Sequence, residues 1–89
     1  VKKALMGGFA NSKILDLHGE RMINNDYKPG FKAGLHLKDL NIALDLSDKV
    51  GLNLKSAKYS QKLMKIANQN NDQDKDSSII NKIIIKNKK

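Results

Sequence analysis

The chain has 89 residues, no cysteine and a formal net charge of +8. This length suits one small domain, which buries about 60–65% of the surface that its unfolded chain exposes. The lack of cysteine excludes disulfides, thiolate catalysis and zinc sites built from cysteine. No apolar run approaches the ~20 residues of a membrane-spanning helix, so the sequence predicts a soluble, cytoplasmic protein without membrane attachment.

The positive charge raises the question of nucleic-acid binding, which draws on clustered basic residues. Of the 17 basic residues, all but Arg21 are lysines. Nucleic-acid sites favour the bidentate fork of arginine and aromatic side chains that stack on bases. The aromatic residues here, two Phe and two Tyr, are scattered along the chain. The abundant Lys, Asn and Ile are typical of AT-rich codons, so the composition argues against a nucleic-acid partner.

The N-terminal part of the chain predicts two helices. Val1–Met6 has the composition of a last helical turn, which Gly7-Gly8 would end because glycine readily adopts the left-handed conformation. Asn11 or Ser12 would cap the next helix. Its apolar residues follow the 3.6-residue period only in part, so its inner face is less clearly defined than those of the later helices.

A loop and a long helix follow. Residues 24–30 have loop composition, and Pro29-Gly30 suits the centre of a type II turn with positive φ at the glycine. Phe31 comes directly after this turn. From 34 to 50 the apolar residues cover more than one stripe, which predicts a helix packed on two sides, and Gly51 is a natural terminator.

The C-terminal part predicts two more helices. Residues 56–67 have a clear inward face, residues 68–76 have the composition of a solvated loop, and Asp76 or Ser77 would cap a terminal helix or frayed tail over 77–89. Ile79, Ile80, Ile83 and Ile84 would share a face of that helix. Their β-branched side chains leave a strand as the alternative. The whole outline is an all-α domain of four or five helices.

Few residues suggest chemistry of their own. The sequence contains neither a G-x-G-x-x-G nor a Walker motif, so a dinucleotide site cannot be built from this chain alone. His18 and His36 are the only histidines, and neither belongs to an H-E-x-x-H motif. We interpret both as ordinary, partly exposed histidines and predict no metal site.

Lys38 and Asp39 lie near the expected start of the long helix. The positive end of a helix dipole favours a bound anion, so a lysine beside exposed amide groups there could hold a phosphate or carboxylate ligand. The alternative is a solvated Lys38 with Asp39 as a favourable acid near the helix start. The residues alone leave both interpretations open.

Three motifs occur in order along the chain: GFANS at residues 8–12, PGF at 29–31 and LHLKDLNIAL at 35–44. With these motifs, nearly the whole sequence closely resembles the C-terminal helical domain of the β-hydroxyacid dehydrogenases. That family includes 3-hydroxyisobutyrate dehydrogenase and 2-hydroxy-3-oxopropionate reductase. The resemblance implies a small all-α fold like the C-terminal domain of 6-phosphogluconate dehydrogenase, with residues 1–89 as part of that domain and its Rossmann partner domain missing.

The resemblance also implies roles for three residues. Phe31 matches an aromatic near the nicotinamide and the substrate, Lys38 matches a lysine that contacts the cofactor, and Asp39 matches the acid that supports the cleft beside it. The family's catalytic lysine lies upstream, in a motif that this sequence lacks. Lys2 and Lys3 have no such context, so we assign no catalytic residue here and expect this chain alone to be inactive.

The implied function is that of an NAD(P)-dependent oxidoreductase, with hydride transfer between the nicotinamide and a hydroxy acid or semialdehyde. NAD or NADP would be held mainly by the Rossmann domain, and the protein would be a homo-oligomer. Two alternatives stay open. One is a basic helical module that binds nucleic acid or an acidic protein, and the other is a purely structural dimerisation domain.

Overall fold

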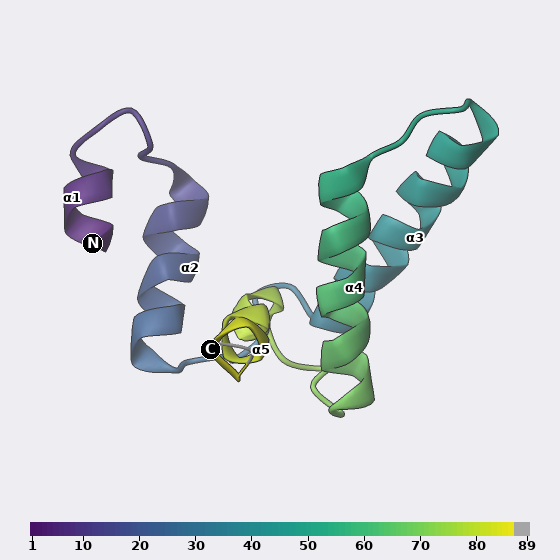
Figure 1. Cartoon of the computed structure of the whole chain (residues 1–89). Coiled ribbons are helices and arrows are strands. Elements are labelled where there is room, and N and C mark those ends of the chain that lie inside the picture. Colours follow the sequence, from purple (N-terminus) through teal and green to yellow (C-terminus); the bar gives the residue numbers. More distant parts are fainter. Residues whose placement is uncertain (87–89) are drawn as a thin grey trace.

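The computed structural model describes residues 1–86 and shows an all-α fold (Figure 1). Its elements are α1 (Lys2–Met6), α2 (Lys13–Asn24), α3 (Ala33–Lys49), α4 (Lys55–Gln69), the short 3-10 helix η1 (Ser77–Ile79) and α5 (Ile80–Lys86). No strand occurs within 1–86, where one isolated bridge pairs Lys32 with Asp76. The predicted fold class is confirmed, and the strand alternative for the C-terminal isoleucines is wrong. Residues 87–89 of the predicted terminal helix lie outside the described part.

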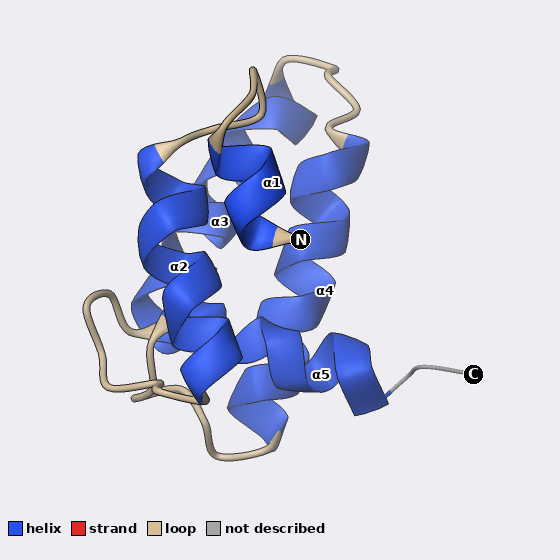
Figure 2. Ribbon diagram, turned by 90° about the vertical axis from the view of Figure 1, so that its left-hand side faces the viewer, coloured by secondary structure: helices blue, strands red, loops and turns tan. Residues whose placement is uncertain are grey.

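The helices form two hairpins, α1 with α2 and α3 with α4, while η1 and α5 lie between them (Figure 1). Figure 2 shows the α1–α2 hairpin from its outer side, with α5 near the lower end of α4. No helix among residues 1–86 is both long and apolar enough to cross a bilayer. The hairpins thus diverge from a common base formed by η1 and α5.

The hydrophobic core belongs to the α3–α4 side of this base. Its buried members are Tyr27, Ala33, Leu37, Leu63, Met64, Ala67, Ile79 and Ile83. The predicted inward face of the 56–67 helix is confirmed, because its members are buried or half-buried. They are Ala57, Ser60, Leu63, Met64 and Ala67. Of the four isoleucines expected to share a face, Ile79 and Ile83 are buried, whereas Ile84 is half exposed. None of the residues of α2 (Lys13–Asn24) is buried, so α2 stands outside the core.

Several helix ends follow the sequence prediction. The hydroxyl of Ser12 caps α2 by accepting a hydrogen bond from the amide of Leu15 at 2.9 Å. Gly51 has φ of 77° just after α3, which suits a glycine terminator. The end of α1 differs, because Gly7 has φ of −83° and stays in the right-handed region. The Gly7 amide still bonds to the carbonyl of Leu5 at this short turn.

The Pro29-Gly30 turn is not type II, because Gly30 is absent from the positive-φ residues of the described chain. A close approach explains the glycine better. A Cβ on Gly30 would lie 2.8 Å from Nη2 and 2.9 Å from Nη1 of Arg21. Glycine at this position therefore leaves room for the arginine head group beside the turn.

The polar run 68–76 is only partly a solvated loop. Helix α4 continues to Gln69, and Asp76 at the far end of the run has no exposed surface. Asp76 caps η1 by accepting from the amide of Ser78, so the capping prediction is confirmed. Its burial was not predicted, because the partners that satisfy it come from distant parts of the chain.

We expect Ile79→Val to lower the free energy of unfolding by about 0.5–1.5 kcal/mol, because Ile79 is fully buried and the lost methylene leaves a void. The matched control is Ile84→Val, at a half-exposed isoleucine in the adjoining helix. Urea unfolding followed by circular dichroism measures both variants. Equal losses of stability in the two variants would contradict this placement of the core.

Candidate functional site

Phe31 lies at the entrance to α3. Its side chain is 43% exposed, and its ring meets the ring of His36 edge to face, with centroids 5.6 Å apart. The backbone of Phe31 is held more firmly than its ring. Its carbonyl oxygen accepts from the amide of Ser77 at 2.9 Å and from the hydroxyl of Ser77 at 3.0 Å. An exposed aromatic ring on a fixed backbone can form one wall of a ligand cleft.

Lys38 and Asp39 are both exposed in the second turn of α3. The amides that begin this helix are already used, since Ala33 donates to the carbonyl of Lys75 and Gly34 donates to that of Gln73, each at 2.8 Å. The expectation of exposed amides next to Lys38 is therefore wrong, because the loop before η1 occupies them. Lys38 has no ion-pair partner among residues 1–86, so its ammonium group can meet an anionic ligand from outside.

A buried carboxylate lies directly behind the turn that carries Phe31. Oδ1 of Asp76 accepts from the amide of Gly30 at 2.9 Å and from the amide of Phe31 at 3.0 Å. The same oxygen pairs with Nη1 of Arg21, which reaches it from α2. Asp76 therefore joins two segments that are separated from it by about half of the chain.

The second oxygen of Asp76 is also satisfied. Oδ2 accepts from the amide of Ser78 at 3.0 Å and from its hydroxyl at 2.6 Å, and Nδ1 of His18 lies 3.4 Å away. Burial would raise the pKa of Asp76, but the hydrogen bonds from Ser78, Phe31 and Arg21 outweigh it and hold that pKa well below its usual value. The carboxylate is therefore ionised at neutral pH.

Ser77 also positions His36. Nδ1 of His36 lies 2.9 Å from the hydroxyl oxygen of Ser77, which is itself 3.0 Å from the carbonyl oxygen of Phe31. The hydroxyl of Ser77 can both donate and accept, so it can bond to either group. His36 is held by Ser77 on one side and contacts the ring of Phe31 on the other.

Comparison with known protein families identifies the family of this chain. A family model described as NAD-binding of NADP-dependent 3-hydroxyisobutyrate dehydrogenase matches residues 1–84. The chain belongs to this family. The resemblance found in the sequence motifs is confirmed.

Two relatives in the dehydrogenase family illustrate the match. The 2-hydroxy-3-oxopropionate reductase of Escherichia coli (strain K12) is 46% identical over 80 residues, which cover 90% of this chain and 27% of the reductase. The probable 3-hydroxyisobutyrate dehydrogenase-like 1, mitochondrial, of Arabidopsis thaliana is 38% identical over 61 residues, covering 68% of this chain and 18% of that protein. The chain thus spans about a quarter of the length of the first relative.

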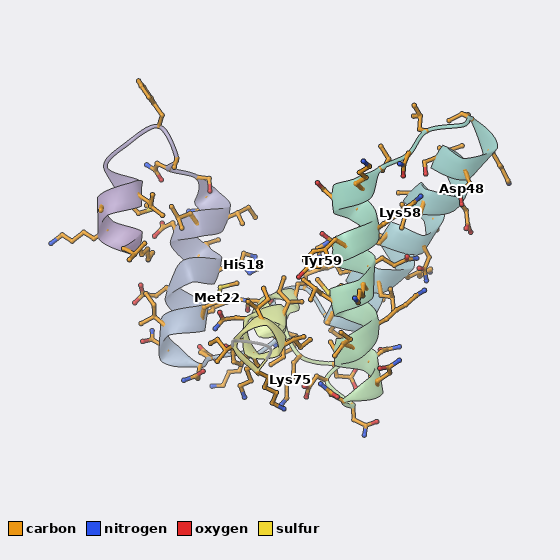
Figure 3. The ribbon with its side chains drawn as sticks, viewed as in Figure 1. His18, Met22, Asp48, Lys58, Tyr59 and Lys75 are labelled. Carbon is orange, nitrogen blue, oxygen red and sulfur yellow. The ribbon has the colours of Figure 1, made fainter. Side chains whose placement is uncertain are left out.

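A small cavity adjoins the buried network of this dehydrogenase-family chain. It has a volume of about 200 Å³ and lies between α2 and the base of the α3–α4 hairpin. Its lining includes Ile14, His18, Met22, His36, Met64, Ser77, Ser78 and Ile80. Figure 3 shows His18 and Met22 on the side of α2 that faces the other hairpin. Residues 1–86 hold no group of three side chains suited to a metal ion.

Sequence reasoning predicted Phe31, Lys38 and Asp39 but missed the role of Arg21 and Asp76. The structure brings Phe31 together with His36 and Asp76, and it gives Phe31 no hydrogen-bonding, ionic or aromatic contact with Lys38 among the described residues. Two local signals were available. Arg21 is the one arginine of a lysine-rich chain, and Asp76 begins an Asp-Ser-Ser run that suits a helix cap.

Asp76 should also make stability depend on pH. Its pKa is about 3.8 without these contacts and lower in the folded chain, so the unfolded chain takes up a proton first as the pH falls. The stabilisation is complete above the unfolded pKa and is lost as the pH drops from there towards the folded pKa. We expect Asp76→Asn to cost about 1–3 kcal/mol at neutral pH.

The measurement is urea unfolding of the wild type and Asp76→Asn at a series of pH values. The stability gap between them should narrow as the pH falls below about 4. Asp74→Asn is the matched control, because Asp74 is 80% exposed and its ion pair with Lys32 spans 3.6 Å. A gap that stays constant down to pH 2 (about two units below the ordinary pKa) would show that Asp76 is not the stabilising carboxylate.

Proposed function

We propose that residues 1–89 form part of the C-terminal domain of an NAD(P)-dependent β-hydroxyacid dehydrogenase, where they close the cofactor and substrate cleft. The observation that carries the proposal is the family match over 1–84, which includes the Phe31 turn and the start of α3. The whole enzyme would resemble the E. coli 2-hydroxy-3-oxopropionate reductase or a 3-hydroxyisobutyrate dehydrogenase. Its substrate would be a small hydroxy acid or the corresponding semialdehyde.

The exposed residues fit a cofactor that is bound mainly by a Rossmann domain. Lys38 offers a cation without an ionic partner in the described chain, which suits the anionic part of NAD or NADP. Phe31 offers an aromatic wall for the nicotinamide side of the cleft, and Asp39 supports the cleft beside Lys38. The nicotinamide, when bound, supplies the hydride chemistry. No residue of this chain is assigned the proton transfer, which the family's upstream lysine would perform.

Other parts of the proposal concern the assembled protein. The full enzyme would act as a homo-oligomer in the cytoplasm, and this chain without a Rossmann domain would not turn over substrate. Several apolar side chains of the α1–α2 hairpin support burial against a further protein surface, since they are exposed here. They are Leu5, Phe9, Ile14, Leu17 and Ile23.

The test joins this chain to the Rossmann half of the E. coli reductase and follows NAD(P)H oxidation with tartronate semialdehyde and methylmalonate semialdehyde. We expect Lys38→Ala to raise the KM for the cofactor about tenfold to a hundredfold, because a charge-assisted hydrogen bond contributes about 1.5–3 kcal/mol. The matched control is Lys62→Ala, at an exposed lysine of α4. Asp39→Ala should also lower turnover.

Two results would contradict the proposal at different levels. A folded hybrid enzyme without turnover on either semialdehyde would remove the dehydrogenase assignment and leave only the fold. Turnover with an unchanged cofactor KM in Lys38→Ala would keep the dehydrogenase assignment and remove Lys38 from the cofactor site.

One observation favours the alternative of nucleic-acid binding. Helix α4 carries a lysine stripe at i, i+3, i+7 and i+10, all exposed, and contains no acidic residue. The stripe consists of Lys55, Lys58, Lys62 and Lys65. Such a row of cations on one helix face can contact successive phosphates of a strand.

If the stripe binds DNA, the logarithm of affinity should fall with the logarithm of salt concentration with a slope of about −3 to −4. Fluorescence polarisation with a labelled duplex measures this slope. The double variant Lys58→Glu, Lys62→Glu should abolish binding, whereas Lys13→Glu, Lys49→Glu has the same net charge and leaves the stripe intact. If the two double variants lowered the affinity equally, the binding would depend on net charge and not on the stripe.

A further inference from the structure

The backbone of Phe31 is fixed from both sides by residues that lie 45 or more positions later. Its amide donates to Oδ1 of Asp76 at 3.0 Å, and its carbonyl accepts from the amide and the hydroxyl of Ser77. The amide of Gly30 reaches the same carboxylate oxygen. The amide and the carbonyl of Phe31 are therefore both bonded to the same short segment, residues 76 and 77.

Asp76 is itself held in place. Its side chain has no exposed surface, and it meets Arg21 and His18 from α2 and Ser78 from η1. Its own amide donates to the carbonyl of Tyr27 at 2.9 Å. A carboxylate that is fixed by partners from three segments has no freedom to follow a displaced turn, so it can serve as a rigid support.

The ring of Phe31 lacks comparable support of its own. It is 43% exposed, and within residues 1–86 its one aromatic contact is an edge-to-face contact with His36. His36 in turn is oriented through Ser77. Much of the ring is exposed, so burial alone does not fix it, and its direction depends in part on the backbone to which it is attached and on the contact with His36.

We propose that Asp76 and Ser77 are positioning residues for Phe31: they hold its backbone so that its exposed ring keeps one orientation towards the cofactor cleft. The link to the cleft rests on the function proposed above. The structural half of the inference, that Asp76 and Ser77 orient the Phe31 side chain, holds for the chain by itself and can be tested without turnover.

The first experiment uses Phe31→Trp as a reporter, because the chain contains no tryptophan. Tryptophan anisotropy and acrylamide quenching are measured in the reporter chain and in the same chain with Asp76→Asn. We expect lower anisotropy and greater quenching with Asp76→Asn, at unchanged helix content by circular dichroism. The reporter chain with Asp74→Asn is the control, since Asp74 lies two residues away and is largely exposed.

Ser77→Ala in the reporter chain keeps the inference testable if Asp76→Asn does not fold. This variant removes the hydroxyl contacts with Phe31 and His36 but leaves the carboxylate and its ion pair intact. It should shift anisotropy and quenching in the same direction, by a smaller amount. Values equal to those of the unmodified reporter would overturn the positioning role.

The second experiment measures turnover in the hybrid enzyme that retains Phe31. A displaced ring misaligns the reacting atoms, so Asp76→Asn should lower kcat about tenfold to a hundredfold. The KM for the cofactor should change little, because Lys38 and the Rossmann domain retain their contacts. Ser77→Ala should lower kcat less, and Asp74→Asn should not affect it.

The two experiments separate two kinds of failure. An inactive hybrid enzyme overturns the dehydrogenase proposal, and the reporter chain then still decides whether Asp76 and Ser77 orient residue 31. An active enzyme in which Asp76→Asn raises the KM for the cofactor but leaves kcat unchanged would overturn the positioning role in catalysis.

Discussion

A buried carboxylate sets the main constraint on this fold. An ionised group without exposed surface is stable only where hydrogen bonds and an opposite charge replace its water. Asp76 obtains these partners from the Gly30–Phe31 turn, from Arg21 on α2 and from Ser78 on η1. The three segments must therefore converge on one point, and this convergence brings α2 and the start of α3 together at η1.

This constraint matters most for α2, which lacks the apolar anchoring of the other long helices. Its described residues are all at least partly exposed, and it packs against α1 and η1. Arg21 and His18 supply the polar contacts that join it to the base of the molecule. Apolar contacts have no preferred direction, whereas a hydrogen-bonded pair of guanidinium and carboxylate groups requires a defined geometry. The orientation of the α1–α2 hairpin therefore depends on a few directional bonds.

The sequence predicted the helices and most caps because these features depend on local patterns. The period of the apolar residues located α3 and α4, and Ser12, Gly51 and Asp76 were recognisable as end signals. The conformation of Gly30 was predicted wrongly, since the need for glycine comes from the approach of Arg21 and not from φ. No local sequence pattern predicts such a close approach between residues that are distant in the sequence.

The same distinction applies to the candidate site. Family resemblance pointed to Phe31 and Lys38, but the physical argument for Lys38 assumed free amides at the start of α3. Those amides bond to carbonyls of Gln73 and Lys75, which a local interpretation treated as part of a solvated loop. The exposed ammonium group of Lys38 has no ion-pair partner among residues 1–86 and stays available to an anion.

Replacing a buried ion pair by apolar residues often leaves a protein equally or more stable, so stability alone does not explain why a charge lies here. The directional hydrogen bonds of Asp76 explain its presence better. An apolar contact beneath the Gly30–Phe31 turn would keep the turn packed against the protein. It would not select one orientation of the backbone of the turn. Asp76 accepts two successive amides with one oxygen, and Ser77 holds the following carbonyl. These bonds fix the planes of the peptide units on both sides of Phe31. The exposed ring is thereby attached to a backbone of defined orientation, which helps it to face one cleft.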